Sequence, residues 1–346
     1  MKRVLGVALI AGLVTTGLTA CDPPMPPDVA AQIAEQSYTC IDGEAKVAFP
    51  TLLSDITPGL VDGLASACLD PAMTMVQADS AAGADVVIDA YPAPCSAAVT
   101  VPYAIEAADV TAYFADGYAI TLSPKNISAI FAGSITDWSD AAIAAENPDL
   151  VLPAEPIVVR KSADELAFNA LAKWFKHLGA DLSSDGFTFT QGDQEFAPLQ
   201  EGEIAIIPHS VGYFNATVPV GIIIASDPEI GNVIANADNL GIGSGATKMT
   251  AKNDGDNVAI TLNFDAEAKP MPGFDTADNP YDAIYPVNLT MCSQATDLSR
   301  AVATFLLRLD NQGSLGASAF NPLSTDARIV SLLAARKGLP EPQPTE

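Results

Sequence analysis

Short apolar runs alternate with amphipathic stretches along the first hundred residues after the N-terminal segment. The pattern predicts strands at residues 45–49, 73–77 and 85–88, with a helix over residues 52–67 between the first two. Strands separated by single helices are typical of βαβ units, in which helices cover a mostly parallel sheet. The sequence therefore predicts an α/β fold.

The alternation of predicted strands and helices continues after residue 101. The pattern predicts strands at 119–122, 156–159, 204–208, 220–224, 258–264 and 287–291, and helices at 125–131, 163–178, 299–311 and 327–336. Residues 227–282 are richer in Asp, Asn and Gly, and Asn253-Asp254-Gly255-Asp256 is typical of a hairpin turn. The Gly-rich run 241–245 is interpreted as a flexible loop.

The N-terminus has the features of an export signal. Met1-Lys2-Arg3 is basic, residues 4–20 are apolar, and a Pro-rich segment follows Cys21. The small residues before Cys21 resemble the bacterial lipobox, so we expect a signal peptide over 1–20, acylation of Cys21, and a linker over 21–39. The protein would then be extracytoplasmic and anchored to the bacterial cell membrane through its lipid. An ordinary secreted protein cleaved nearby is the alternative.

Length and charge narrow the classes of partner. The 346 residues favour two lobes of ordinary size, and 49% hydrophobic residues are enough to form cores. Acidic residues number 42 against 16 basic ones, which gives a formal net charge of −26. Nucleic acid is excluded as an expected partner, because a polyanion requires a basic surface.

Four cysteines remain after Cys21, namely Cys40, Cys68, Cys95 and Cys292. An even number in an oxidising compartment predicts two disulfides, with three pairings open. Buried free thiols are the alternative. With two histidines and no Cys-x-x-Cys, we expect no metal site. The chain also has no nucleophile elbow or Ser-x-x-Lys motif, so we expect neither an enzyme nor a cofactor.

One segment resembles a known family. Asn126-Ile-Ser-Ala-Ile-Phe-Ala-Gly-Ser-Ile-Thr-Asp-Trp138, followed by Asn147-Pro148, is similar to the "I-F-x-G-x-I-T-x-W" helix and "N-P" of the phosphate-binding lipoproteins of ABC uptake systems. The similarity continues in residues 152–160, Phe168-Asn169 and Tyr285-Pro286, and covers roughly residues 43–338.

The resemblance implies a two-lobed periplasmic-binding-protein fold of type II, with hinge crossovers near residues 96–104 and 279–288. Lobe I would comprise residues 40–100 and 283–346, including all four remaining cysteines, and lobe II residues 101–282. A monomer would hold phosphate or another small anion between the lobes and deliver it to an ABC transporter permease.

The resemblance also implies three elements of an anion site. The family's "T-F-P" loop aligns with Ala48-Phe49-Pro50, where the backbone amide of Phe49 could donate. Its Gly-Ser-Gly turn corresponds to the segment around Ser80, and its proton-accepting aspartate corresponds to Asp89. Neutral donors suit a phosphate receptor because they hold a dianion without full countercharge.

The fourth element departs from the family. Where the family has "R-x-D-x-S-G-T-x-F-N", Asp164, Glu165 and Leu166 replace Ser, Gly and Thr. Ser162 and Glu165 have the spacing of a capping box, which would satisfy the helix amides that otherwise await an anion.

Arg160 and Lys161 could still grip an anion, and pairing with Asp164 or Glu165 is their alternative role. The candidate ligand-binding residues are thus Phe49, Ser80, Asp89, Arg160, Lys161, Ser162 and Asp164. An alternative function is a cell-envelope interaction or sensing module with the same fold that no longer binds phosphate.

Overall fold

The computed structural model describes residues 29, 33, 35, 38–191, 196–229, 231–270 and 276–340. The expected signal peptide over 1–20, Cys21 and most of the expected linker lie outside these residues. In the described part of the chain, every helix is too short or too polar to span a membrane.

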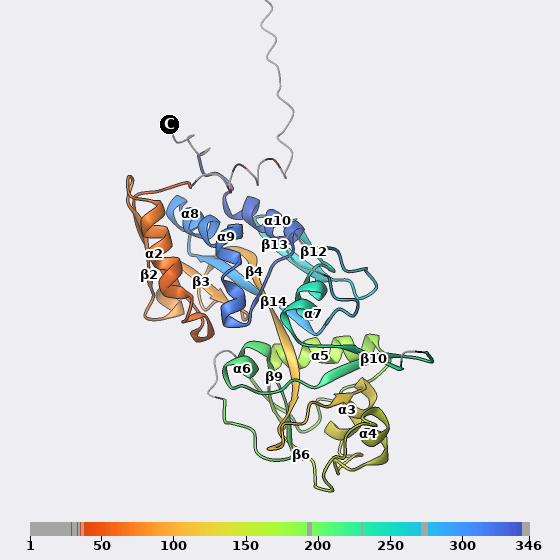
Figure 1. Ribbon diagram of the computed structural model, residues 1–346. Coiled ribbons are helices and arrows are strands. Elements are labelled where there is room, and N and C mark those ends of the chain that lie inside the picture. Colours follow the sequence, from red (N-terminus) through yellow and green to blue (C-terminus); the bar gives the residue numbers. More distant parts are fainter. Residues whose placement is uncertain are drawn as a thin grey trace, which may run out of the picture.

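Lobe I is built on a mixed sheet in the strand order β2-β1-β3-β14-β4. Strand β1 pairs in parallel with β2 and β3, whereas β14 is antiparallel to both β3 and β4. Helices α2 and α8 lie beside this sheet (Figure 1). The bounds are β1 Gly43–Ala48, β2 Met73–Gln77, β3 Val86–Asp89, β4 Ala97–Ala112, β14 Ile284–Cys292, α2 Thr57–Ala67 and α8 Asp297–Leu306.

Strand β4 runs through both lobes. Residues 97–107 pair with β14, and residues 108–112 pair with β9 (Glu203–Pro208) in lobe II. Every residue from 101 to 112 is buried, because this strand forms the centre of both lobes. The first expected crossover, 96–104, is therefore part of one long strand, and the start of β14 falls inside the second expected crossover.

Lobe II contains the elements from β5 to β11 and the C-terminal part of β4 (Figure 1). Its two fully buried tryptophans, Trp138 and Trp174, anchor the core. The bounds are β5 Thr121–Leu122, β6 Val158–Val159, β7 Ser162–Asp164, β8 Thr188–Thr190, β10 Gly221–Asp227, β11 Gly231–Ala235, α3 Pro124–Phe131, α4 Ala141–Glu146, α5 Glu165–His177 and α6 His209–Phe214.

Residues 239–262 pack against lobe I, although the sequence assigned them to lobe II. They form α7 (Asn239–Ala246) and the hairpin of β12 (Met249–Asp254) and β13 (Asn257–Leu262). The hairpin contacts α10 (Thr325–Ala335) and β4, so it belongs with the chain ends although the expected lobe II extended to residue 282. The turn at 253–256 is confirmed, whereas the interpretation of 241–245 as a flexible loop was wrong.

Glycine has a structural role in α7. A Cβ on Gly241 would collide with the carbonyl oxygen of Asn236, and one on Gly245 would collide with that of Tyr281. The glycines therefore allow close packing of the helix against the neighbouring backbone rather than flexibility.

The chain end completes lobe I. The predicted helix at 299–311 is split into α8 and α9 (Leu309–Gln312), and the predicted helix at 52–67 is split into a 3-10 turn (Thr51–Leu53) and α2. Pro58 lies in the first turn of α2, where its missing N–H costs least. The remaining elements are β15 Asn321–Pro322 and the 3-10 turns Ala81–Gly83 and Leu315–Ser318.

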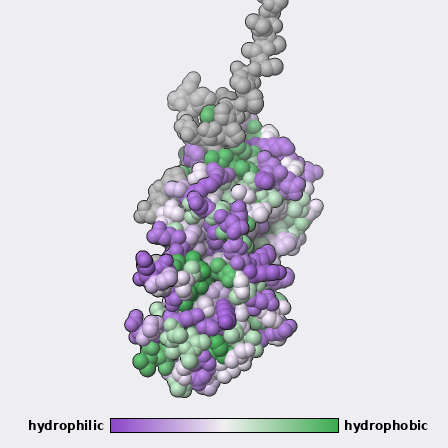
Figure 2. Space-filling view, turned by 90° about the vertical axis from the view of Figure 1, so that its right-hand side faces the viewer, coloured by the Kyte–Doolittle hydropathy of each residue, from purple (hydrophilic) through white to green (hydrophobic). Residues whose placement is uncertain are grey.

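Both expected disulfides are present and lie in lobe I. Cys40 pairs with Cys68, and Cys95 pairs with Cys292. The second bond joins the chain just before β4 to the end of β14. Hydrophilic residues cover much of the face shown in Figure 2, as the excess of acidic side chains leads us to expect.

Candidate ligand site between the lobes

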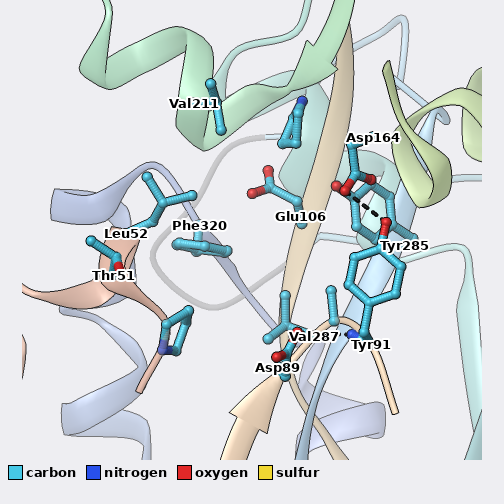
Figure 3. Close-up of a pocket in the computed structure, with 13 residues that line it drawn as sticks. Thr51, Leu52, Asp89, Tyr91, Glu106, Asp164, Val211, Tyr285, Val287 and Phe320 are labelled. Carbon is cyan, nitrogen blue, oxygen red and sulfur yellow. Dashed lines mark hydrogen bonds between the residues drawn. The ribbon is translucent and has the colours of Figure 1, made fainter. Parts of the chain in front are cut away.

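A cavity of about 280 Å³ lies where the two lobes meet beside β4 (Figure 3). Lobe I contributes the loops that follow β1 and β3, together with β14 and Phe320. Lobe II contributes Asp164 at the start of α5 and Val211 in α6. The cavity therefore occupies the place where a two-lobed binding protein holds its ligand.

Asp164 caps helix α5. One carboxylate oxygen, Oδ1, accepts hydrogen bonds from the backbone amides of Leu166 and Ala167, both at 2.9 Å. The other oxygen, Oδ2, accepts the hydroxyl hydrogen of Tyr91 at 2.7 Å. Burial raises the pKa of Asp164, although these hydrogen bonds oppose the shift. The carboxylate thus occupies the anion position at the N-terminus of this helix.

The predicted capping box was wrong in its details. Ser162 is exposed and lies in β7, because residues 162–164 pair with β8 in extended conformation. The helix begins only at Glu165, so Asp164 is the capping residue. Glu165 instead accepts a hydrogen bond from the side chain of Gln191 at 2.7 Å.

Glu106 is a second carboxylate at the cavity, and sequence reasoning missed it. It is 3% exposed, and Oε1 accepts hydrogen bonds from the amides of Ala107 (2.9 Å) and Ser210 (3.3 Å). Its Oε2 accepts the hydroxyl hydrogen of Ser210. Burial raises the pKa of Glu106 to about 7, although these hydrogen bonds and nearby His209 lower it. A lone glutamate inside an otherwise apolar strand was the signal that could have identified it.

An ion pair lies beside Glu106. The Nδ1 atom of His209 is 3.0 Å from Oδ2 of Asp109, which is fully buried. Burial alone would lower the pKa of His209, but the hydrogen bond and charge of Asp109 outweigh it and raise the pKa. His209 is thereby held by a structural partner.

Of the lobe I candidates, only Asp89 lies at the cavity. It is the last residue of β3, and its Oδ1 accepts a hydrogen bond from the backbone amide of Tyr91 at 2.9 Å. Phe49 is buried in the core, and Thr51 and Leu52 line the cavity after it. Ser80 is exposed and lies outside the cavity. The structure therefore brings Asp89 and Asp164 to one site and places the side chains of Phe49 and Ser80 elsewhere. Donation by the Phe49 backbone amide to a ligand stays a prediction.

Arg160 and Lys161 have other partners. The guanidinium of Arg160 forms two hydrogen bonds with Glu203, at 2.8 and 2.9 Å, and one with the carbonyl oxygen of Ala197. The ammonium of Lys161 donates to the carbonyl oxygen of Asp185 at 2.8 Å. The alternative role of these cations, pairing with Asp164 or Glu165, was wrong. The parallel pairing of β6 with β9 brings Arg160 to Glu203 instead.

The electrostatics of the cavity are those of an acidic site. Asp89, Glu106 and Asp164 line it, and no described lining residue is Lys, Arg or His. Arg160 lines a neighbouring cavity that also includes Asp164, but Glu203 holds its guanidinium. Two like charges 4 Å apart repel by roughly 4 kcal/mol at an effective dielectric of 20. A phosphate ion in the cavity would meet such repulsion without a lining cation to offset it.

Comparison with known proteins gives one curated relative and several distant structures. No family model matches the chain. The chain is 28% identical over 222 residues to phosphate-binding protein PstS 3 of Mycobacterium leprae, a match that covers 59% of this chain and 57% of the relative. The chain thus spans less than two thirds of the length of this relative.

Several of the solved structures that it is similar to are described as phosphate-binding proteins. They include the high-affinity periplasmic phosphate-binding protein PfluDING (TM-score 0.49, 14% identity, 85% of this chain and 93% of that one). A putative phosphate ABC transporter substrate-binding protein from Clostridium perfringens has a TM-score of 0.43, with 12% identity over 82% and 100% of the chains. An ABC-type phosphate transport receptor from Vibrio cholerae has a TM-score of 0.40, with 11% identity over 80% and 99%. In sequence, this chain resembles phosphate-binding proteins over part of its length.

Proposed function

We propose that this protein is an extracytoplasmic solute-binding lipoprotein of an ABC-type uptake system. It holds a small solute between its lobes and delivers it to a permease, and it catalyses no reaction. The observation that carries this proposal is the cavity beside β4, to which both lobes contribute side chains. The sequence resemblance to phosphate-binding proteins supports the same class of protein.

Hinge closure provides the mechanism. The long strand β4 and the segment between β11 and α7 connect the lobes, so a ligand that contacts both lobes favours the closed arrangement. The closed form is the one that a permease would recognise. Acylated Cys21 would keep the protein beside that permease on the outer face of the membrane.

A specific observation favours a second candidate, a sensing or interaction module with the same fold that does not bind phosphate. Asp164 occupies the N-terminus of α5, and Glu106 accepts two hydrogen bonds from Ser210 at the start of α6. These carboxylates accept the hydrogen bonds that a phosphate receptor would offer to its ligand.

Solution scattering distinguishes the two candidates. The secreted, unacylated form beginning at Asp22 would be stripped of bound solute and measured alone and with an extract of small solutes from the producing cells. A decrease in the radius of gyration with the extract, reversed by dialysis, is expected for a receptor. An unchanged radius with every solute fraction would contradict the receptor and favour the interaction module.

A further inference from the structure

The chemistry of the interlobe cavity points to the class of its solute, an inference that rests on the proposed receptor function. Glu106 and Asp164 form no salt bridge with a Lys or Arg among the described residues. The charge of His209 acts on Glu106 and lowers its pKa, but His209 has its own hydrogen-bonding partner in Asp109. The carboxylates at the cavity are therefore not neutralised by basic side chains that line it.

A second observation is independent of the acidic residues. Tyr285 lines the cavity and is 8% exposed, yet its hydroxyl forms no hydrogen bond with any described residue. The oxygen atom itself is not among the buried polar atoms that lack a partner, because the cavity leaves it accessible. This hydroxyl lies at the cavity and is available to a ligand.

The rest of the wall is aromatic and aliphatic. Figure 3 shows Phe320 and the carboxylate of Glu106 close to each other, with Tyr91 and Tyr285 together on the side of Asp164. Leu52, Val211 and Val287 supply aliphatic surface. Aromatic faces attract organic cations, and aliphatic surface buries their carbon atoms.

A bare metal ion fits this site poorly. Metal ions require several ligating atoms at short distance around one point. Among the described residues, no three Asp, Glu, His or Cys side chains converge closely enough to hold a metal ion. The acidic residues of the cavity are therefore not arranged as ligands of a single metal ion.

We propose that the interlobe cavity binds a small organic ammonium ion, whose charge lies beside the acidic residues that line the cavity and whose carbon atoms contact the aromatic and aliphatic wall. A volume of about 280 Å³ is near the lower end of the usual range for small-molecule sites, so the ligand is a compact amine. The hydroxyl of Tyr285 accepts a hydrogen bond from an N–H of such a ligand or contacts its polarised methyl groups.

Calorimetric titration of the mature lipoprotein in detergent tests this assignment. The probes are choline, putrescine and tetramethylammonium, with inorganic phosphate titrated in parallel. We expect at least one of the three cations to bind with a dissociation constant in the micromolar range, and phosphate to give no saturable heat. Saturable binding of phosphate with silence from all three cations would overturn the proposal.

Charge-neutralising variants locate the binding. Asp89→Asn and Glu106→Gln are expected to weaken cation binding about tenfold or more, because each removes one carboxylate from the cavity. The matched control is Asp149→Asn, which removes an exposed carboxylate outside the cavity and should leave the affinity within about twofold. Circular dichroism verifies that each variant is folded. Equal effects of the three variants would mean non-specific attraction and would overturn the site.

Mass spectrometry of the solute released from the purified native protein tests the ammonium ligand separately from the receptor function. Release of an organic amine is the expected result. Release of a neutral or anionic solute would overturn the ammonium assignment and leave the receptor function standing. Absence of any solute, together with silence from all probes and an unchanged radius of gyration, would overturn both.

Discussion

The hydroxyl of Tyr91, from the loop after β3 in lobe I, donates a hydrogen bond of 2.7 Å to Asp164 at the start of α5 in lobe II. The same hydroxyl oxygen is 3.3 Å from the amide of Leu166, which donates to it. One side chain of lobe I thus contacts both the carboxylate that caps α5 and the Leu166 amide that this carboxylate also binds. This contact links the lobes directly at the edge of the cavity.

Tyr91→Phe should loosen this link. A hydrogen bond to a charged group contributes about 1.5 to 3 kcal/mol, so the open arrangement should gain roughly tenfold or more in population. Solution scattering of the solute-free protein should show a larger radius of gyration. The matched control is Tyr213→Phe, which removes a hydroxyl from a side chain that is 57% exposed. Identical radii for the two variants would show that the link does not hold the lobes together.

Glu106 predicts a pH dependence of stability. Its folded pKa, about 7, lies above the ordinary value of 4.5, so between these values the folded state holds a proton that the unfolded state has released. Stability therefore falls as pH rises from about 4.5 to about 7, by at most roughly 3 kcal/mol from this group. The raised pKa of His209 acts in the same direction, because its contribution is lost as pH rises through the folded pKa.

Glu106→Gln isolates the glutamate part, because it leaves the His209 and Asp109 pair in place. The free energy of unfolding of the variant minus that of the original protein should be larger at pH 8 than at pH 5. Urea denaturation of both proteins at the two pH values measures this difference. Its free energy of unfolding should depend less on pH between 5 and 8. A constant difference between the two proteins across this range would contradict the assignment.

The two disulfides should differ in their contribution. Replacing both cysteines of either pair by serine should cost about 2 to 5 kcal/mol, because each bond restricts the unfolded chain. The separation is 197 residues for Cys95 and Cys292 but 28 for Cys40 and Cys68. Removing the Cys95–Cys292 bond, which closes the longer loop, should therefore lower the free energy of unfolding by roughly 1 to 2 kcal/mol more than removing the other bond. Denaturant unfolding of the two double variants checks this order, and the reverse order would refute the loop-length explanation.

Arg160→Gln should affect stability rather than binding. Breaking its bidentate contact leaves the buried carboxylate of Glu203 without its cation, which should cost about 1 to 3 kcal/mol. Lys161→Gln is the comparison, because the Lys161 ammonium donates to one exposed backbone carbonyl and should cost less. Thermal unfolding and calorimetry measure both effects. A large loss of solute affinity in Arg160→Gln with unchanged stability would show that Arg160 binds the ligand.

Local periodicity predicted most of the elements but not how long they run. The strand at 73–77 has the expected bounds, and the helix expected at 163–178 is α5. The length of β4 was not predictable from alternation, because a strand buried on both faces has a nearly continuous apolar sequence. Both helix splits depend on tertiary packing that a one-dimensional pattern does not contain.

The site was harder to predict than the fold. The sequence identified Asp164 as a departure from an anion loop, and the structure makes it the cap of α5. Glu106 was missed because its role depends on Ser210, which is 104 residues away and becomes a neighbour only through the pairing of β4 with β9. The same pairing geometry explains why the partner of Arg160 is Glu203.

The central claim is that Asp164 occupies the position at α5 where an anion would otherwise bind. Its most direct test is calorimetric titration of phosphate into the solute-free mature protein and into the Asp164→Ser/Glu165→Gly/Leu166→Thr variant. We predict no saturable heat for the original protein, and measurable phosphate binding in the variant, where the carboxylate is gone and hydroxyl and amide donors are exposed. Micromolar or tighter binding of phosphate by the original protein would contradict the claim.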